Sequence, residues 1–519
     1  EPFLADKKQP LSLVFAIPDH PWVDSSNGAA VRIAMTAAQR GRVESILHEV
    51  VSENDGADGE IAVSIDSKKG RLNADLTVGS DVGSAVLLRA NMGLALRGIT
   101  LVGQGFVLNE QQADQLRKSS SSVIKPFANG RDITQSSRRA FVIDLFDLGE
   151  NEVRDKYPTT YQWVYDRVKP ERGQNARESY RKNWWIFAEP RREFRIATRS
   201  LRRYIATPMT AKHRLFLLLP SSTLPDQGLV PIALEDCYAL GLLSSQIHIV
   251  WSLAAGGTLE DRPRYNQSRC FETFPFPDAN ARATPIIRAL SAKLDEHRKR
   301  QQIAHPALTL TGMYNVLEKL RSGEALTAKD RVIHENGLVS VLRHLHDDLD
   351  AAVLDAYGWP DLLPLLRIAH GNDAPAAGQT RDDSKRAFDE AILERLVALN
   401  AERAAEEARG MVRWLRPEFQ NPQRTQAPQQ AELDADSAED GSDTVIPTAL
   451  KPTPWPKDAV DQVRAVADLL ANSPAPLSID EIGNRFTARG PWKKRLPQLL
   501  DMLVALGRVE LRGGAYFPP

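Results

Sequence analysis

The 519-residue sequence contains only two cysteines, Cys237 and Cys270. Neither has a Cys or His partner at metal-ligand spacing, so the sequence predicts neither a disulfide framework nor a zinc knuckle. A reducing compartment, and therefore the cytoplasm, fits this cysteine usage best.

Long apolar runs are also lacking. The longest, around residues 240–255, is broken by Ser244, Ser245, Gln246 and His248. A membrane-spanning helix needs about 20 apolar residues, so we expect a soluble protein with no membrane partner. The chain begins with Glu1, and no charged start, apolar core and small-residue cleavage site follow it. A fragment and a natural subunit both stay open.

Two catalytic signatures are missing from the sequence. Amino-methyltransferases use a Pro-Pro-aromatic tetrapeptide, but the only adjacent prolines are Pro518 and Pro519. Nuclease metal sites require a carboxylate followed by Glu-x-Lys, and no Glu-x-Lys occurs in the sequence. We therefore expect no catalytic, metal-binding or cofactor-binding residues in this chain.

Two short motifs have ordinary structural interpretations. Gly103-Gln104-Gly105 lies between two β-rich runs instead of opening a helix, so a tight bend is favoured over a cofactor loop. His344 and Asp348 are one helical turn apart and suit a metal, but apolar residues at three and four spacing around them favour an amphipathic helix.

Positive charge is concentrated in one segment of the sequence. The whole chain has a net charge of −1, yet residues 167–214 carry fourteen Lys or Arg against four acids, an excess of ten positive charges. Trp, Tyr and Phe are interspersed among them. Such a cationic segment is typical of a surface that docks on phosphates, because each bound Lys or Arg releases counterions.

Arginines recur at three and four spacing between Pro190 and Tyr204, which predicts one helix with guanidinium groups along one side. The alternative is a solvated basic face. The residues expected to position DNA phosphates are Arg191, Arg192, Arg195, Arg202, Arg203 and Lys212, with His213 and Arg214 in the same segment. Base reading is expected from Arg264, Tyr265, Asn266 and Arg269, since Arg pairs with guanine and Asn with adenine; a plain polar loop fits almost equally well.

Hydrophobic periodicity predicts an α+β chain. Strands are expected at 11–18, 29–36, 60–66, 71–78, 99–108, 140–144, 185–188, 204–208 and 215–219. Helices are expected at 111–118, 158–169 and 235–253, and then at 286–301, 311–322, 332–357 and 384–410. The acidic stretch 420–450 predicts a flexible linker. Helices at 460–470, 479–485 and 493–506 followed by a hairpin at 509–517 indicate a winged helix.

A set of motifs, spread in a fixed order along the chain, resembles those of a known protein family. It comprises Asn183-Trp184-Trp185-x-Phe187, Arg203-Tyr204-Ile205-x-Thr207-Pro208, Ala211-Lys212-His213-Arg214, Leu240-Gly241-x-Leu243-Ser244-Ser245, Arg264-Tyr265-Asn266 and Trp414-Leu415-Arg416-Pro417. These resemble the target-recognition half of MmeI-like, type IIL class I adenine-specific DNA methyltransferases of restriction-modification and phage-defence systems. The resemblance covers about four fifths of the chain.

The resemblance implies double-stranded DNA as a partner and S-adenosylmethionine as the cofactor, bound by an N-terminal methyltransferase half that precedes residue 1. It implies the last strands of a methyltransferase sheet at 1–86, a target-recognition domain at 87–278 and a helical domain at 279–419. An acidic linker at 420–450 and a winged-helix module at 451–519 lie outside it. On its own the chain should bind DNA without methylating it.

Two rival functions remain open. One is a free-standing specificity subunit that pairs with a separate catalytic chain. The other is a structural protein whose basic face meets an acidic partner.

Overall fold

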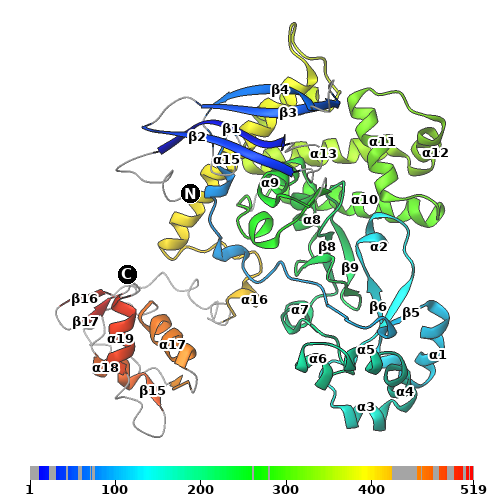
Figure 1. The fold of residues 1–519 in the computed structure, drawn as a ribbon, viewed down its shortest axis with the longest axis vertical. Helices are drawn as coiled ribbons and strands as arrows, with labels where there is room; N and C mark the ends of the chain where they lie inside the picture. The colour runs from blue at the N-terminus through cyan, green and yellow to red at the C-terminus, as the bar shows by residue number, and fades with distance from the viewer. Residues whose placement is uncertain are drawn as a thin grey trace, which may run out of the picture. The chain divides into compact units, whose positions relative to one another are not determined.

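The computed structural model describes residues 11–22, 31–41, 45–55, 61–70, 72, 76, 78–259, 262–278, 281–422, 453–456, 459–471, 479–487, 496–505, 510–512 and 515–517. The chain divides into two compact units, Glu1–Ala427 and Pro428–Pro519. The fold is α+β, as the sequence predicts (Figure 1). The expected linker at 420–450 falls almost entirely outside the described residues.

The first unit opens with a four-stranded sheet in the order β2-β1-β3-β4. Its strands are β1 (Leu11–Trp22), β2 (Val31–Arg40), β3 (Ser45–Asp55) and β4 (Ile61–Gly70). β1 and β2 confirm the strands expected at 11–18 and 29–36, and the two pair antiparallel. β4 confirms the strand expected at 60–66 but continues through Lys68 and Lys69 to Gly70 in its pairing with β3, and among the residues described at 71–78 only an isolated bridge between Leu72 and Val78 is found. Lysines are common on an edge strand, where their side chains reach solvent.

Two small sheets form the centre of residues 79–278. One has the order β10-β6-β7-β5 and the other β11-β8-β9. Their strands are β5 (Val107–Leu108), β6 (Ile124–Ala128), β7 (Ala140–Ile143), β8 (Arg203–Pro208), β9 (Leu217–Pro220), β10 (Leu224–Pro225) and β11 (Leu229–Ile232). The expected strand at 185–188 is wrong: this segment turns, and only Ala188 and Glu189 bond to the backbone of Leu101 and Thr100.

Short helices surround these sheets: α1 (Glu110–Ser120), α2 (Gly130–Thr134), α3 (Glu150–Lys156), α4 (Pro158–Arg167), α5 (Lys169–Gly173), α6 (Glu178–Lys182) and α7 (Arg192–Thr198). The helices predicted at 111–118 and 158–169 are confirmed as α1 and α4. Asn109 begins α1 with a capping box, and Pro158 starts α4 at the position where its missing N–H costs nothing.

The helix predicted at 235–253 is two helices, α8 (Cys237–Ser244) and α9 (Gln246–Gly256), separated by the extended residue Ser245. The expected end at Gly257 is confirmed. Among the described residues, no single helix is long and apolar enough to cross a membrane; α8 and α9 reach that length and composition only as a pair bent by 62°.

Helices dominate from residue 283 onward (Figure 1). They are α10 (Ala283–Ala304), α11 (Leu310–Ser322), α12 (Ala328–Gly337), α13 (Val339–Tyr357), α14 (Leu363–Ala369), α15 (Arg381–Ala408) and α16 (Pro417–Gln420). The single helix predicted at 332–357 is broken at Leu338, which takes a left-handed φ of 44°. His344 and Asp348 lie on α13 as part of an amphipathic helix, which confirms the ordinary interpretation.

One continuous hydrophobic cluster joins these helices to the sheets. Gly241 of α8 lies so close to α10 that a Cβ there would stand 2.5 Å from Ile287 Cγ2. Hydrogen bonds also join the two parts: the side-chain amide of Asn400 of α15 donates to the carbonyl of Thr273 at 2.7 Å. The helical part is therefore packed onto residues 79–278 within one unit.

The second unit contains α17 (Ala459–Ala471), α18 (Ile479–Asn484), α19 (Leu496–Ala505) and the hairpin β16 (Glu510–Arg512) and β17 (Ala515–Phe517). β14 (Thr453–Pro454) pairs with β15 (Phe486–Thr487). A separate cluster that includes Val466, Ile482 and Leu500 forms its core. The predicted order of three helices and a hairpin is confirmed.

The Gly103-Gln104-Gly105 motif is a tight bend, as expected. Gly103 has a φ of 149° and precedes a single 3₁₀ turn. Gly105 packs against the end of α4, where its carbonyl accepts a hydrogen bond from Trp163 Nε1 at 2.9 Å. A Cβ at Gly105 would stand 2.8 Å from the backbone carbonyl of Arg167. Close packing, and not a cofactor, explains this glycine.

Gly105→Ala is therefore expected to lower the free energy of unfolding by about 1 to 3 kcal/mol, because the backbone of Arg167 cannot rotate away as a side chain would. Thermal unfolding followed by circular dichroism measures this effect. Gly149→Ala is the matched control, since a Cβ there meets nothing within 4 Å. Equal melting temperatures for the two variants would show that the bend tolerates a side chain.

Candidate nucleic-acid interface

The arginine-rich segment is not one helix. α7 covers only Arg192–Thr198, and Arg203 already begins β8. The prediction of a single helix from Pro190 to Tyr204 is wrong because β8 pairs with both β9 and β11, and this long-range pairing overrides the local spacing. The arginines consequently point into different surroundings, and each has to be considered by its own contacts.

Arg195 is held inside the protein. Its guanidinium donates two hydrogen bonds to the Asp144 carboxylate, at 2.7 and 2.9 Å, and Nε donates to the carbonyl of Pro190. The group also lies 4.4 Å from the ring centre of Phe146. These contacts give Arg195 a structural role that holds α7 in place, while its predicted contact with DNA stays a prediction.

Arg214 and Tyr265 are also structural. Arg214 is buried and donates to the carbonyls of Pro208 and Pro263, while its guanidinium lies 5.1 Å from the ring centre of Tyr265. Tyr265 is 1% exposed and its hydroxyl bonds to Nε2 of His248 at 3.0 Å. Burial lowers the pKa of His248 to about 3, so this imidazole is neutral. Neither predicted contact reaches the surface in this structure.

Lys212 and His213 attach their loop to α11. Lys212 Nζ lies 2.8 Å from Asn315 Oδ1 and 3.2 Å from Glu318 Oε2. His213 Nε2 lies 2.8 Å from the same Asn315 oxygen. Burial lowers the pKa of His213. Lys212 remains more than half exposed, so its pair with Glu318 is weak and can exchange for another anion.

Two further arginines are partly committed. Arg191 takes a left-handed φ of 55°, donates to the carbonyl of Gly98 and lies 3.7 Å from Glu189. Arg203 is exposed, but it donates from Nε to the carbonyl of Glu235 and from Nη2 to Cys237 Sγ. Both keep part of the guanidinium edge available to a ligand.

Five arginines of residues 183–278 are exposed and have no hydrogen-bond or ion-pair partner for their side chains within the described part of the chain. These are Arg192, Arg199, Arg202, Arg264 and Arg269. Arg264 precedes a short π-helix, Gln267–Phe271, and Arg269 lies within it; the first turn is capped by the side-chain oxygen of Asn266. Asn266 thus shapes the loop, and the two free arginines frame it.

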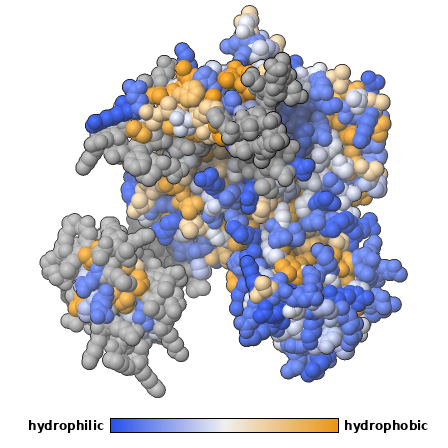
Figure 2. Space-filling model, in the orientation of Figure 1, coloured by the Kyte–Doolittle hydropathy of each residue, from blue (hydrophilic) through white to orange (hydrophobic). Residues whose placement is uncertain are grey.

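The sequence reasoning missed a cation–aromatic surface on α4. Arg167 lies 3.8 Å from the ring centre of Trp163, and Lys169 lies 4.3 Å from that of Tyr165 and 4.9 Å from that of Trp184. The signal was present as the alternation Trp163-x-Tyr165-x-Arg167-x-Lys169. Figure 2 shows a largely hydrophilic surface over α3–α6. Of the three rings only that of Tyr165 is exposed, and an exposed ring beside cations is typical of nucleic-acid surfaces.

Cys237 and Cys270 are free, buried thiols, and burial raises the pKa of Cys270 to about 11. Within the described ranges, no group of three or more His, Cys, Asp or Glu side chains is arranged to hold a metal ion.

The chain is similar to a known protein family, to a bacterial protein and to a solved structure. Residues 96–278 match the family model described as MmeI, target recognition domain. DNA methyltransferase A of Bacillus subtilis (strain 168) is 31% identical over 80 residues, which are 15% of this chain and 8% of that protein. The solved structure of the type IIL restriction-modification enzyme MmeI in complex with DNA shares the fold with a TM-score of 0.53 at 17% identity. That match covers 76% of this chain and 46% of the MmeI chain. This chain therefore spans less than half the length of either relative.

The contacts of Arg195 and Arg192 predict opposite behaviour. Arg195→Ala leaves the Asp144 carboxylate buried without its cation, so we expect the free energy of unfolding to fall by about 2 to 4 kcal/mol. Arg192→Ala removes an exposed side chain and should change it by no more than about 0.5 kcal/mol. Urea unfolding of both variants measures the difference. A neutral Arg195→Ala substitution would contradict the structural role.

Proposed function

Because residues 96–278 form a target recognition domain of the MmeI kind, we propose that this chain recognises a DNA sequence on behalf of a restriction-modification enzyme. The match of the recognition domain is the observation that carries the proposal. The neighbouring structure, which contains DNA, supports duplex DNA as the partner.

The five free arginines divide into two groups under this proposal. Arg192, Arg199 and Arg202 come from α7 and the turn before β8, and they neutralise phosphates together with Lys212 and Arg203. Phosphate contacts fix register and carry no sequence information. The exposed guanidinium groups suit this role because they bind without first breaking an internal pair.

Base reading falls to the segment Arg264–Arg269. Its backbone is fixed at its start, where Tyr265 N donates to the carbonyl of Met209 and Arg264 N donates to the carbonyl of Gly257, and Arg269 N donates back to the carbonyl of Asn266. Arg264, Gln267 and Arg269 offer the side chains that discriminate guanine and adenine in the major groove. A loop held this firmly presents them in one arrangement, which is what discrimination between bases requires.

Chemistry on the bound DNA is assigned to protein outside the described residues. The complete enzyme would methylate an adenine with S-adenosylmethionine as donor, a proposal supported by the local identity to DNA methyltransferase A. The residues present do not fit that cofactor, because Gly103 and Gly105 are packed against α4 and open no helix. The sheet β1–β4 would be the place where the methyltransferase half joins.

The second unit completes the proposal as a winged-helix module, based on the order of α17, α18, α19 and the β16–β17 hairpin. The complete protein would act in the cytoplasm, where restriction-modification enzymes meet DNA.

Salt-dependent DNA binding tests the phosphate assignment. The slope of log affinity against log salt should fall by about 0.9 for each phosphate contact removed. The triple variant Arg192→Gln, Arg199→Gln, Arg202→Gln is therefore expected to lose two to three units of slope on a random-sequence duplex, measured by fluorescence anisotropy. Arg331→Gln with Arg409→Gln removes exposed charge from the helical part and is the control. An unchanged slope in the triple variant would refute the assignment.

Selection of preferred duplexes from a random library tests the base-reading segment. Arg264→Ala, Gln267→Ala and Arg269→Ala should each relax preference at one position of the selected sequence, by about 1 to 3 kcal/mol per lost bidentate contact. Arg199→Ala, a phosphate variant, should weaken binding equally for all sequences. Identical selected sequences for all four variants would move base reading to another part of the chain.

A further inference from the structure

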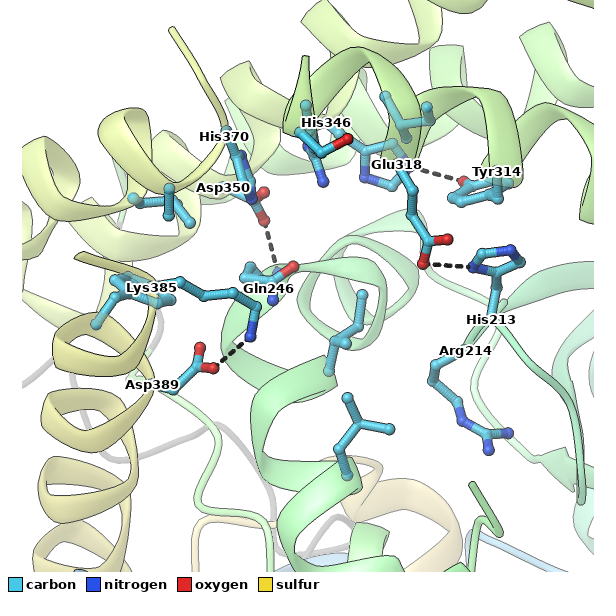
Figure 3. Close-up of a pocket in the computed structure, with 18 of the residues that line it drawn as sticks. His213, Arg214, Gln246, Tyr314, Glu318, His346, Asp350, His370, Lys385 and Asp389 are labelled. Atoms are coloured by element: carbon cyan, nitrogen blue, oxygen red, sulfur yellow. Dashed lines mark hydrogen bonds and ion pairs between the residues drawn. The ribbon is translucent and has the colours of Figure 1, made fainter. Parts of the chain in front are cut away.

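A cavity of about 570 Å³ lies where α9 meets the helical part (Figure 3). Its walls come from the loop of Lys212–Arg214, the bend between α8 and α9, and helices α11, α13, α14 and α15. The volume suits a small organic molecule. Among the residues proposed to contact DNA, Lys212 also lines this cavity.

Most charged groups of the cavity neutralise one another. Lys385 Nζ lies 2.6 Å from Asp389 Oδ2, and Arg321 Nη2 lies 3.0 Å from Asp347 Oδ1. Arg381 donates to the backbone carbonyls of Arg321 and Ser322. Arg321, Arg381 and Lys385 are therefore already committed, and Lys212, paired with Glu318, is the weakly held cation of the lining.

Asp350 is the exception. It is 3% exposed, and its Oδ1 accepts a hydrogen bond from the backbone N–H of Gln246 at 2.7 Å, drawn as a dashed line in Figure 3. Oδ2 has no hydrogen-bond partner among the described residues, and none of their cations forms an ion pair with this carboxylate. Burial raises the pKa of Asp350 to about 7. A buried carboxylate without a cation is costly, so the group is poised to accept one.

Uncommitted polar groups line the same cavity as Asp350. The hydroxyl of Ser244 is buried and has no hydrogen-bond partner in the described structure. The side-chain amide of Gln246 lines the same space without a bond to another described residue. Ile249, Leu253 and Leu366 supply apolar surface around them. The combination is one anionic group, neutral hydrogen-bonding groups and an apolar wall.

We propose that this cavity binds an organic cation, a primary ammonium or amidinium group carried on a small apolar body. The cationic nitrogen pairs with the Asp350 carboxylate and shares further hydrogen bonds with Gln246 and Ser244, while the apolar body rests against Ile249, Leu253 and Leu366. Such a ligand contacts α9 of the recognition segment and α13–α14 of the helical part together. It therefore fastens the helical part to the recognition domain.

Benzamidine and benzamide test the proposal, because they have the same shape and only benzamidine is cationic. Titration calorimetry on the whole chain at pH 8 should show benzamidine binding at least about tenfold more tightly, as expected for a charge-assisted pair in a buried site. Asp350→Asn keeps an oxygen for the Gln246 N–H and should reduce benzamidine to the affinity of benzamide. Asp382→Asn removes an exposed carboxylate from the cavity rim and should preserve the preference.

The pH dependence gives a readout that needs no variant. The charged and titratable groups that line the cavity with Asp350 are Lys212, His213, Arg214, Glu318, Arg321, His346, His370, Arg381, Asp382, Lys385 and Asp389, and the charge of Asp347 also acts on Asp350. Burial lowers the pKa values of His346 and His370, the latter to about 4, and hydrogen bonds from His370 and Asn372 with the charge of Arg321 lower that of Asp347. These three groups keep their charge state between pH 6 and 8.

A carboxyl group with a pKa near 7 is mostly protonated at pH 6 and must release its proton to pair with a cation. Benzamidine affinity should therefore rise about tenfold from pH 6 to pH 8, with proton release at the lower pH. Benzamide affinity should stay constant. Equal affinity for benzamidine and benzamide, an unaltered preference in Asp350→Asn, or a pH-independent benzamidine affinity would each overturn the proposal.

Discussion

Buried guanidinium groups that donate to backbone carbonyls hold the recognition segment together. Arg172 is fully buried and donates to the carbonyls of Leu101 and Ile186, and Arg214 joins Pro208 to Pro263. Arg416 reaches Ala197 and Ala233 from the far end of the unit. Burying a guanidinium is costly unless its donors are satisfied, and its planar fork of five N–H groups can satisfy several loops together. The loops between the small sheets therefore depend on these arginines for their relative positions.

This constraint divides the positive charge of the segment into two populations. Arg172, Arg195 and Arg214 donate hydrogen bonds to groups inside the protein, whereas Arg192 and Arg202 remain exposed. A rigid frame under exposed arginines matters for recognition, because a side chain that must discriminate bases has to be presented from a fixed backbone. The loop that begins at Arg264 meets this condition through the burial of Tyr265 beneath it. Basic composition alone does not separate the buried arginines that hold the structure from the exposed arginines that are proposed to contact phosphates.

The helical part belongs to the same physical unit. Arg298 of α10 donates to the carbonyl of Phe216 and, with Tyr314 and His346, forms a buried polar network next to the cavity of Asp350. The continuous hydrophobic cluster means that a change at this junction is transmitted to α9 and to the strands beneath it. A cation in the cavity would act on the part of the molecule that fixes the recognition loop.

The sequence by itself determined the elements whose signals are local. Asn109 and Pro158 start α1 and α4, Gly257 ends α9, and the MmeI-like motifs located the recognition segment. Only the tertiary structure decided which arginines are buried, where the long helices break and which groups line the cavity. Arg195 meets Asp144 across 51 residues, and Asp350 meets Gln246 across 104. Burial and pairing arise from such distant partners, so spacing along the chain cannot distinguish an arginine that holds a loop from one that is free to bind DNA.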